Sequence, residues 1–396
     1  MPRLPRLVVC CFAFVLLIYV PLFGQERDAA QLSDFSGREI FDELQMREAA
    51  AVGPSKKGGY DWARYLSLSS FTRNPLARLE AEEIFSMENK SKLKQVGSQI
   101  LFHELRRRAI NKGIFGPDDR QDLFRLEARR NELIANGANA DFFNGALLNA
   151  NATCCLIREN QIFQTGSGNS KLFTTPFSES QHDTLKLCPS ERFFSQPIGS
   201  FCTGFLVASD VVVTAGHCID ASNISGARFV FGFRMTDENT PVTSFTKDQV
   251  YGASAIIDRK LDAATGEDWA VVRLNRAVVG VTPLKFRQSG KIADSEKVYV
   301  IGYPSGLPCK VSDNATVNQN NDGFVFTSNL DTYAGNSGSP VFNRVTHEVE
   351  GILVRGGEDF KFVTDVLGGC IQSVMLSDAE GNEACTRSTV WASKIP

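Results

Sequence analysis

Short apolar segments of strand length dominate the chain from about residue 151 onward, and Gly, Asn, Asp, Pro and Ser separate them. Short runs of β-branched and aromatic residues between turn formers predict β-strands, and many such strands in succession predict a barrel or a sandwich. The segments lie at 155–157, 204–207, 211–214, 229–233, 269–274, 298–301 and 351–354. The chain is also rich in Gly and Phe, with 32 and 29 copies, which fits many turns and a bulky core. We therefore expect an all-β fold for this part.

Side chains suited to nucleophilic catalysis stand beside some of these segments. His217 lies in Thr-Ala-Gly-His-Cys, Asp268 directly precedes an apolar strand segment, and Ser337 lies in Gly-Asn-Ser-Gly-Ser-Pro. A serine hydroxyl is a poor nucleophile at neutral pH, so it needs a base within hydrogen-bond reach and a third group that orients the base. We interpret His217 as the base, Asp268 as the orienting carboxylate and Ser337 as the nucleophile. Asp262 and Glu267 are the alternatives to Asp268, but neither precedes a strand in the same register.

The chain order His, Asp, Ser and the two motifs around His217 and Ser337 resemble those of the chymotrypsin-like (trypsin-like) serine peptidases. The resemblance covers about 114–390 and is clearest over 201–360; the stretches 302–306 and 336–342 look closest to bacterial-type members. The stretch 113–120 resembles the mature start of the glutamyl-endopeptidase branch. The resemblance implies two six-stranded antiparallel β-barrels of chymotrypsin type, and hydrolysis of peptide bonds through an acyl-enzyme without a cofactor.

The same resemblance implies an oxyanion hole and a disulfide. The backbone amides of Gly335 and Ser337 would form the oxyanion hole, and a disulfide between Cys202 and Cys218 would hold the histidine loop to the neighbouring strand. Without the two cysteines of the N-terminal segment, an even number of cysteines is left, and their pairing is otherwise open. No Cys-x-x-Cys pair occurs and the chain has 4 histidines, so we expect no metal.

Asp331 is the expected base of the substrate pocket. It lies six residues before Ser337, where trypsin-type members carry an aspartate that pairs with a Lys or Arg of the substrate. The cysteine of those members is absent from this stretch, and Tyr333 and Ala334 occupy it. A structural role in closing the turn is therefore the alternative for Asp331.

Val354, Arg355 and Gly356 are expected to form the wall of this pocket. The wall strand contains no histidine, which the glutamyl branch uses there, so a preference for Glu is not expected. Arg355 would pair with Asp331 or Glu358, or would select an acidic residue of the substrate.

Residues 1–25 read as an export signal, with an uncleaved membrane anchor as the alternative. Arg3 and Arg6 precede an apolar run over 7–23 that is near the lower limit for a membrane span. We therefore expect a secreted protein, either extracellular or periplasmic, with no stable membrane association unless this segment is retained.

The next part of the chain differs in composition from the part rich in strands. Residues 26–112 contain no cysteine and show helical periodicity, and a basic cluster ends at Lys112. We interpret them as a helical pro-region that an activating protease, or the enzyme itself, removes from a peptidase domain at 113–396. A retained partner-binding module is the alternative. A charged helix is expected over 121–138.

A net charge of −3 gives no reason to expect nucleic acid as a partner, so proteins or peptides are the expected substrates. Two other functions compete with a peptidase. One is a catalytically inactive homologue that binds proteins through the same cleft. The other is a serine esterase or lipase, which would need the motif Gly-x-Ser-x-Gly and the chain order Ser, Asp, His. The motif around Ser337 lacks the final Gly, and the chain order here is His, Asp, Ser.

Overall fold

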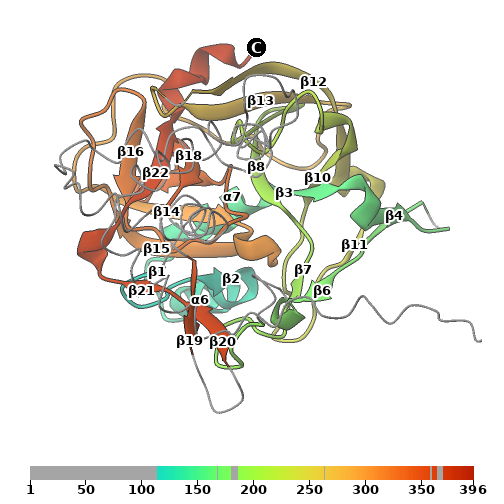
Figure 1. The fold of residues 1–396 in the computed structure, drawn as a ribbon, viewed down its shortest axis with the longest axis horizontal. Coiled ribbons are helices and arrows are strands. Elements are labelled where there is room, and N and C mark those ends of the chain that lie inside the picture. The colour runs from blue at the N-terminus through green and yellow to red at the C-terminus, as the bar shows by residue number, and fades with distance from the viewer. Residues whose placement is uncertain (1–113, 167, 180–185, 263, 357–358, 364–368) are drawn as a thin grey trace, which may run out of the picture. The chain divides into compact units, whose positions relative to one another are not determined.

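The computed structural model describes residues 114–396 except 167, 180–185, 263, 357–358 and 364–368 (Figure 1). The expected signal at 1–25 and pro-region at 26–112 lie outside the described residues. Strands dominate the described part, as predicted, and its α-helices are α6 (Leu123–Ala135) and α7 (Asp141–Asn151). The helix expected over 121–138 is confirmed as α6. No helix among the described residues is long and apolar enough to cross a membrane.

Six antiparallel strands close into a barrel in the order β10-β12-β13-β9-β8-β3. Closure pairs every strand on both sides, so the barrel has no exposed edge. The strands are β3 (Thr153–Arg158), β8 (Cys202–Ala208), β9 (Val211–Thr214), β10 (Ala227–Phe231), β12 (Val250–Leu261) and β13 (Asp268–Leu274). Strands β8 and β9 are a hairpin, and β9 also pairs with β13. The barrel therefore places the end of β9 beside the start of β13.

Seven strands form a second antiparallel sheet in the order β16-β22-β18-β17-β14-β15-β2. The strand ladder is open, so the expected second six-stranded barrel is not confirmed. The segment that follows β15 meets β16 through an isolated bridge between Val317 and Ser328 and through hydrogen bonds between 318–319 and Thr327. The strands are β2 (Gln121–Asp122), β14 (Lys297–Gly302), β15 (Lys310–Thr316), β16 (Val325–Ser328), β17 (Pro340–Asn343), β18 (Val349–Arg355) and β22 (Glu383–Arg387).

Short pairings complete the strand content. Strand β1 (Ile114–Phe115) runs parallel to β21 (Met375–Leu376), so the start of the described chain is held beside its C-terminal part. The others are β4 (Ile162–Gln164), β5 (Ser170–Leu172) and β11 (Ser244–Phe245) in one sheet, β6 (Thr175–Pro176) with β7 (Pro197–Ile198), and β19 (Phe360–Val363) with β20 (Cys370–Ser373).

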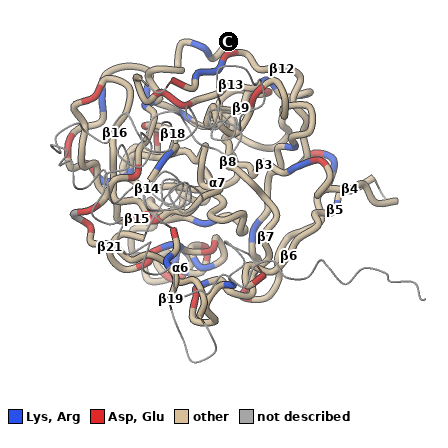
Figure 2. Tube along the Cα trace, in the orientation of Figure 1, with Lys and Arg blue, Asp and Glu red and all other residues tan. Residues whose placement is uncertain are grey.

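One large apolar core joins the barrel to the second sheet. Phe205 of the barrel and Ile352 of β18 belong to it, and both side chains are fully buried. Trp391, near the C-terminus and also fully buried, packs against Phe205 and Phe286. Acidic and basic residues are scattered over the described chain (Figure 2). The shared core fixes the loops of the barrel relative to those of the second sheet.

A disulfide joins Cys188 to Cys370, and a second one joins Cys202 to Cys218. Four further cysteines are buried and form no disulfide within the described part: Cys154, Cys155, Cys309 and Cys385. Of the four disulfides that the cysteine count permits, the structure thus contains two.

Candidate active site

His217 and Asp268 meet because β9 and β13 are neighbours in the barrel. Thr214, the last residue of β9, pairs with Ala270 of β13, so the loop after β9 passes over the start of β13. The backbone N–H of His217 donates to Asp268 Oδ1 at 2.9 Å, and His217 Nδ1 lies 2.7 Å from Asp268 Oδ2. These two contacts fix both the position and the rotation of the imidazole.

The carboxyl group of Asp268 is fully buried, yet it stays ionised. Burial by itself would raise its pKa, but the charges of His217 and Arg355 and the hydrogen bonds from His217 outweigh burial and lower the pKa. The backbone N–H of Asp268 donates to Thr386 Oγ1 of β22 at 3.1 Å. An ionised, immobile carboxylate of this kind can hold one tautomer of histidine and stabilise the imidazolium.

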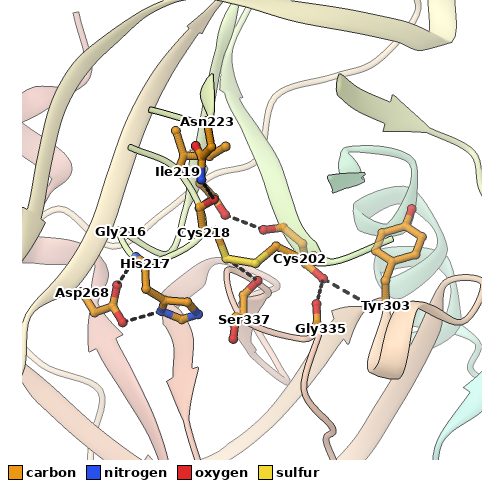
Figure 3. The surroundings of a disulfide bond; sticks show 12 residues. Cys202, Gly216, His217, Cys218, Ile219, Asn223, Asp268, Tyr303, Gly335 and Ser337 are labelled. Carbon is orange, nitrogen blue, oxygen red and sulfur yellow. Dashed lines mark hydrogen bonds and ion pairs between the residues drawn. A yellow bond between two sulfur atoms is a disulfide. The ribbon is translucent and has the colours of Figure 1, made fainter. Parts of the chain in front are cut away.

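Ser337 comes from the second sheet, in the turn before β17, but the barrel holds its main chain. Its carbonyl oxygen accepts the backbone N–H of Thr203 in β8 at 2.8 Å and lies 3.6 Å from Cys218 Sγ. Figure 3 shows the imidazole of His217 between the Asp268 carboxylate and Ser337. The structure therefore brings together all three residues interpreted as base, orienting acid and nucleophile.

The disulfide between Cys202 and Cys218 fastens the histidine loop to the barrel. Cys202 begins β8 and Cys218 directly follows His217, and their Cα atoms are 6.2 Å apart. The disulfide lies between His217 and the start of β8 (Figure 3). It restricts the movement of the loop that carries the base.

The backbone before Ser337 has the shape that an oxyanion hole requires. Gly335 has a φ of +94°, and a Cβ there would come within 2.8 Å of the Tyr303 carbonyl oxygen, so glycine is needed. The Ala334 carbonyl accepts the N–H of Ser305 at 2.6 Å. Because a trans peptide directs its N–H opposite to its C=O, this bond turns the Gly335 N–H away from Ser305.

A second amide is directed in the same manner. The Asn336 carbonyl accepts the N–H of Ser339 at 2.9 Å, which sets the opposite direction for the N–H of Ser337. The Gly335 carbonyl accepts Thr203 Oγ1 at 2.9 Å, so the peptide between the two amides is also held. Within the described chain, the Gly335 N–H meets no acceptor. Such an amide can donate to negative charge that develops on a bound carbonyl oxygen.

Asp331, the expected base of the pocket, uses both carboxylate oxygens to bind the chain's own backbone. Its carboxylate accepts the backbone N–H groups of Phe115 at 2.7 Å and Asp119 at 2.9 Å, and only 3% of the residue is exposed. Burial and the neighbouring Asp119 raise the pKa of Asp331 to about 8. This geometry corresponds to the structural alternative, because the carboxyl group holds the chain's own segment 115–119.

The expected wall residues lie at the end of β18. Val354 is buried, Arg355 is half-buried and Gly356 directly follows the strand. Arg355 Nη2 donates to the carbonyl of Gly266 at 2.9 Å. Arg355 thus reaches the loop that leads into Asp268. Glu358, the other expected partner of Arg355, lies outside the described residues.

Sequence reasoning missed two residues that form hydrogen bonds to the site but lie far from their partners in the sequence. Thr386 accepts the N–H of Asp268 across 118 residues of sequence, and Ser305 sets the direction of the Gly335 amide. No local pattern marks either residue, since each acts through a contact formed only in the folded chain.

One cluster of side chains in the described part has the composition of a metal site. It consists of Cys202, His217 and Cys218. Both sulfurs belong to the disulfide, so they cannot act as thiolate ligands. The cluster is therefore better explained by the disulfide beside the candidate base.

A known protein family matches the part of the chain that contains the candidate site. A family model described as a trypsin-like peptidase domain matches residues 202–352, which contain His217, Asp268 and Ser337. No curated protein matches the sequence.

Two solved structures of the Rv3671c protease from M. tuberculosis are similar. The active form is 15% identical, with a TM-score of 0.35, covering 63% of this chain and 82% of that one. The inactive form is 14% identical, with a TM-score of 0.36, covering 64% and 91%.

Proposed function

We propose that this chain is a secreted serine endopeptidase. It hydrolyses peptide bonds through His217, Asp268 and Ser337 and an acyl-enzyme intermediate. The observation that carries the proposal is the position of the His217 imidazole, hydrogen-bonded to buried Asp268 on one side and facing Ser337 on the other. The match of residues 202–352 to a trypsin-like peptidase domain supports the same function.

The geometry suits acylation by the hydroxyl of Ser337. Its Oγ attacks the carbonyl carbon of the substrate while His217 Nε2 takes the hydroxyl proton. The amides of Gly335 and Ser337 stabilise the negative charge on the carbonyl oxygen, and Asp268 stabilises the imidazolium. His217 then gives the proton to the leaving amine, and water releases the acyl group by the same steps in reverse.

An inactive homologue that only binds proteins is the competing function. An inactive homologue is expected to lack one of the three catalytic residues, or to hold one of them in an orientation that does not permit catalysis. Here the buried carboxylate, the fixed imidazole and the directed amides occur together. This combination favours catalysis over binding alone.

Secretion and removal of the pro-region are part of the proposal. The disulfides Cys188–Cys370 and Cys202–Cys218 fit an oxidising destination. The expected cleavage after Lys112 would free a chain end just before Ile114, which is fully buried. Asp331 holds the next residues and belongs to the segment that leads to Ser337. A change in the position of residues 114–115 after cleavage would therefore act on Asp331 and, through the segment that contains it, on the candidate site.

The test is casein hydrolysis by the secreted protein and by Ser337→Ala. We expect the variant to retain less than about one thousandth of the activity, since loss of a triad member typically costs several orders of magnitude. Ser328→Ala is the matched control, because Ser328 Oγ is buried with no hydrogen-bond partner in the described part. A folded Ser337→Ala protein with more than about a tenth of the activity would refute the proposal.

A further inference from the structure

Arg259 is a charged residue beside the candidate base that the proposed chemistry does not include. It is half-buried and lies near the end of β12, where it pairs with Ala270 of β13. A register shift between Ile256 and Asp258 marks a bulge just before it, and bulges at the rims of barrels re-aim side chains. This end of β12 runs beside the start of β13, at which Asp268 stands.

The guanidinium group of Arg259 joins two backbone carbonyls on either side of His217. Its Nε lies 2.6 Å from the carbonyl oxygen of Gly216 and 2.7 Å from that of Ile219, so one N–H is shared between two acceptors. Gly216 directly precedes the base, and Ile219 follows it by two residues (Figure 3). The bonds of the Arg259 side chain within the described chain go to these two carbonyls. The side chain thus draws the two ends of the segment 216–219 together.

The peptide group between Gly216 and His217 connects Arg259 to the orienting carboxylate. Its carbonyl oxygen accepts the bond from Arg259, and its N–H donates to Asp268 Oδ1 at 2.9 Å. Because a trans peptide directs its N–H opposite to its C=O, holding the carbonyl also fixes the direction of the N–H. A Cβ added to Gly216 would come within 2.3 Å of the Lys260 carbonyl oxygen, so this peptide lies directly on the backbone of β12.

We propose that Arg259 is a positioning residue for the candidate base His217. The inference rests on the proposed peptidase function. The Nε–H of Arg259 holds the carbonyls of Gly216 and Ile219 at one point, and the imidazole that lies between them in the chain then stays directed at Ser337. Arg259 acts through the backbone of the base and not on the substrate. Its effect can still be large, because a displacement of about 1 Å in a catalytic group can lower the rate about 100-fold.

Two substitutions separate the donated hydrogen bonds from the bulk of the side chain. Arg259→Gln places an amide nitrogen at the same position along the side chain as Nε, whereas Arg259→Met places a methyl group there. We expect Arg259→Met to lower kcat for a peptide substrate by at least about 10-fold, with KM changed by less than about 3-fold. Arg259→Gln should keep kcat within about 5-fold of the wild-type value, because the donor is retained.

Arg276→Met is the matched control. Arg276 Nη2 also bonds two backbone carbonyls, those of Lys247 and Val250, but it does so at the opposite end of β12. About 30 Å of extended strand separates Val250 from Arg259. The control should therefore keep kcat within about 2-fold of the wild-type value.

A second measurement separates positioning of the base from a general structural role. A His217→Ala protein has no base to position, so adding Arg259→Met to it should change the residual hydrolysis of a p-nitrophenyl ester by less than about 3-fold. A general structural role would lower hydrolysis in both backgrounds. Thermal unfolding shows whether each variant is folded. Arg259→Leu, which also lacks a donor, replaces Arg259→Met if the latter does not fold.

Any one of four results would overturn the role of Arg259 while leaving the peptidase intact. They are a loss of less than about 10-fold in a folded Arg259→Met protein, an equal loss in Arg259→Gln, an equal loss in Arg276→Met, and an undiminished loss in the His217→Ala background. Failure of the wild-type protein to hydrolyse peptides and to react with a fluorophosphonate would instead refute the proposed function itself.

Discussion

At the scale of single residues, hydrogen bonds to buried groups determine what each candidate catalytic side chain can do. Asp268 can orient the candidate base because His217 approaches it with both its backbone N–H and its Nδ1. Asp331 has the same chemical group but binds two backbone amides, and burial and the neighbouring Asp119 raise its pKa. Two aspartates of equal intrinsic acidity thus have different roles because they have different neighbours.

Asp268→Asn tests the role of the orienting carboxylate. The amide can keep the geometry but favours the wrong tautomer of His217, so kcat should fall by about four orders of magnitude. The unfolding transition should remain cooperative, because the substituted side chain has nearly the same size. Steady-state kinetics beside thermal unfolding would check both points. A loss of less than about tenfold in kcat would show that Asp268 does not orient the base.

At the scale of elements, the site depends on the contact between the barrel and the second sheet. The candidate base and its candidate orienting acid come from the barrel, while the candidate nucleophile and the directed amides come from the turn before β17. Thr203 in β8 connects the two parts, since its N–H binds the carbonyl of Ser337 and its Oγ1 binds that of Gly335. A shift of β8 would therefore displace both the nucleophile and one of the amides.

The disulfide at the start of β8 is predicted to keep this contact in place. Replacing both Cys202 and Cys218 with Ala removes the cross-link without leaving a free thiol. We expect a loss of about 2–5 kcal/mol in the free energy of unfolding, as is typical for a native disulfide in a secreted domain. Chemical denaturation of the oxidised protein and of the variant would measure it. A loss below about 0.5 kcal/mol would mean that the histidine loop is held without the disulfide.

The buried pair of Asp119 and Asp331 predicts a pH dependence of stability. Burial raises the pKa of both groups above the usual 3.8, that of Asp119 to about 6 and that of Asp331 to about 8, and the charge of Asp119 adds to the rise at Asp331. Both groups then keep a proton in the folded chain that they lose on unfolding. Their contribution to stability is present below about pH 4 and is lost as the pH rises toward 8.

Asp331→Asn should remove most of this dependence. When unfolding free energies are measured from pH 4 to pH 8, that of the wild-type protein should fall more steeply with rising pH than that of the variant. We expect the difference between the two proteins to vary by a few kcal/mol over this range. A difference that is constant with pH would show that Asp331 is ionised throughout.

At the scale of the whole molecule, some features could be predicted from sequence and others could not. His217 and Ser337 stand in short local patterns, and Asp268 stands at the start of a recognisable strand, so local patterns select them as candidates. The partners of Asp331 lie more than 200 residues away in sequence, at Phe115 and Asp119, and only the folded chain shows them.

The second sheet illustrates the same limit. Its strands have clear apolar patterns, but closure depends on how the segment after β15 meets β16, and there the structure has a bridge and a few hydrogen bonds in place of a continuous ladder. Likewise, the direction of Arg355 toward Gly266 depends on the loop before Asp268, which comes from the other sheet. Patterns of single segments therefore predict strands well and the contacts between distant segments poorly.

The central claim is that Ser337 is a nucleophile activated by His217. Its most direct test is to treat the secreted protein with a fluorophosphonate and to locate the adduct by mass spectrometry of its peptides. We predict one phosphonylated residue, Ser337, with none at Ser339 in the same turn, and no labelling of a folded His217→Ala variant on the same time scale. A folded wild-type protein that remains unlabelled, or an adduct at another serine, would contradict the account.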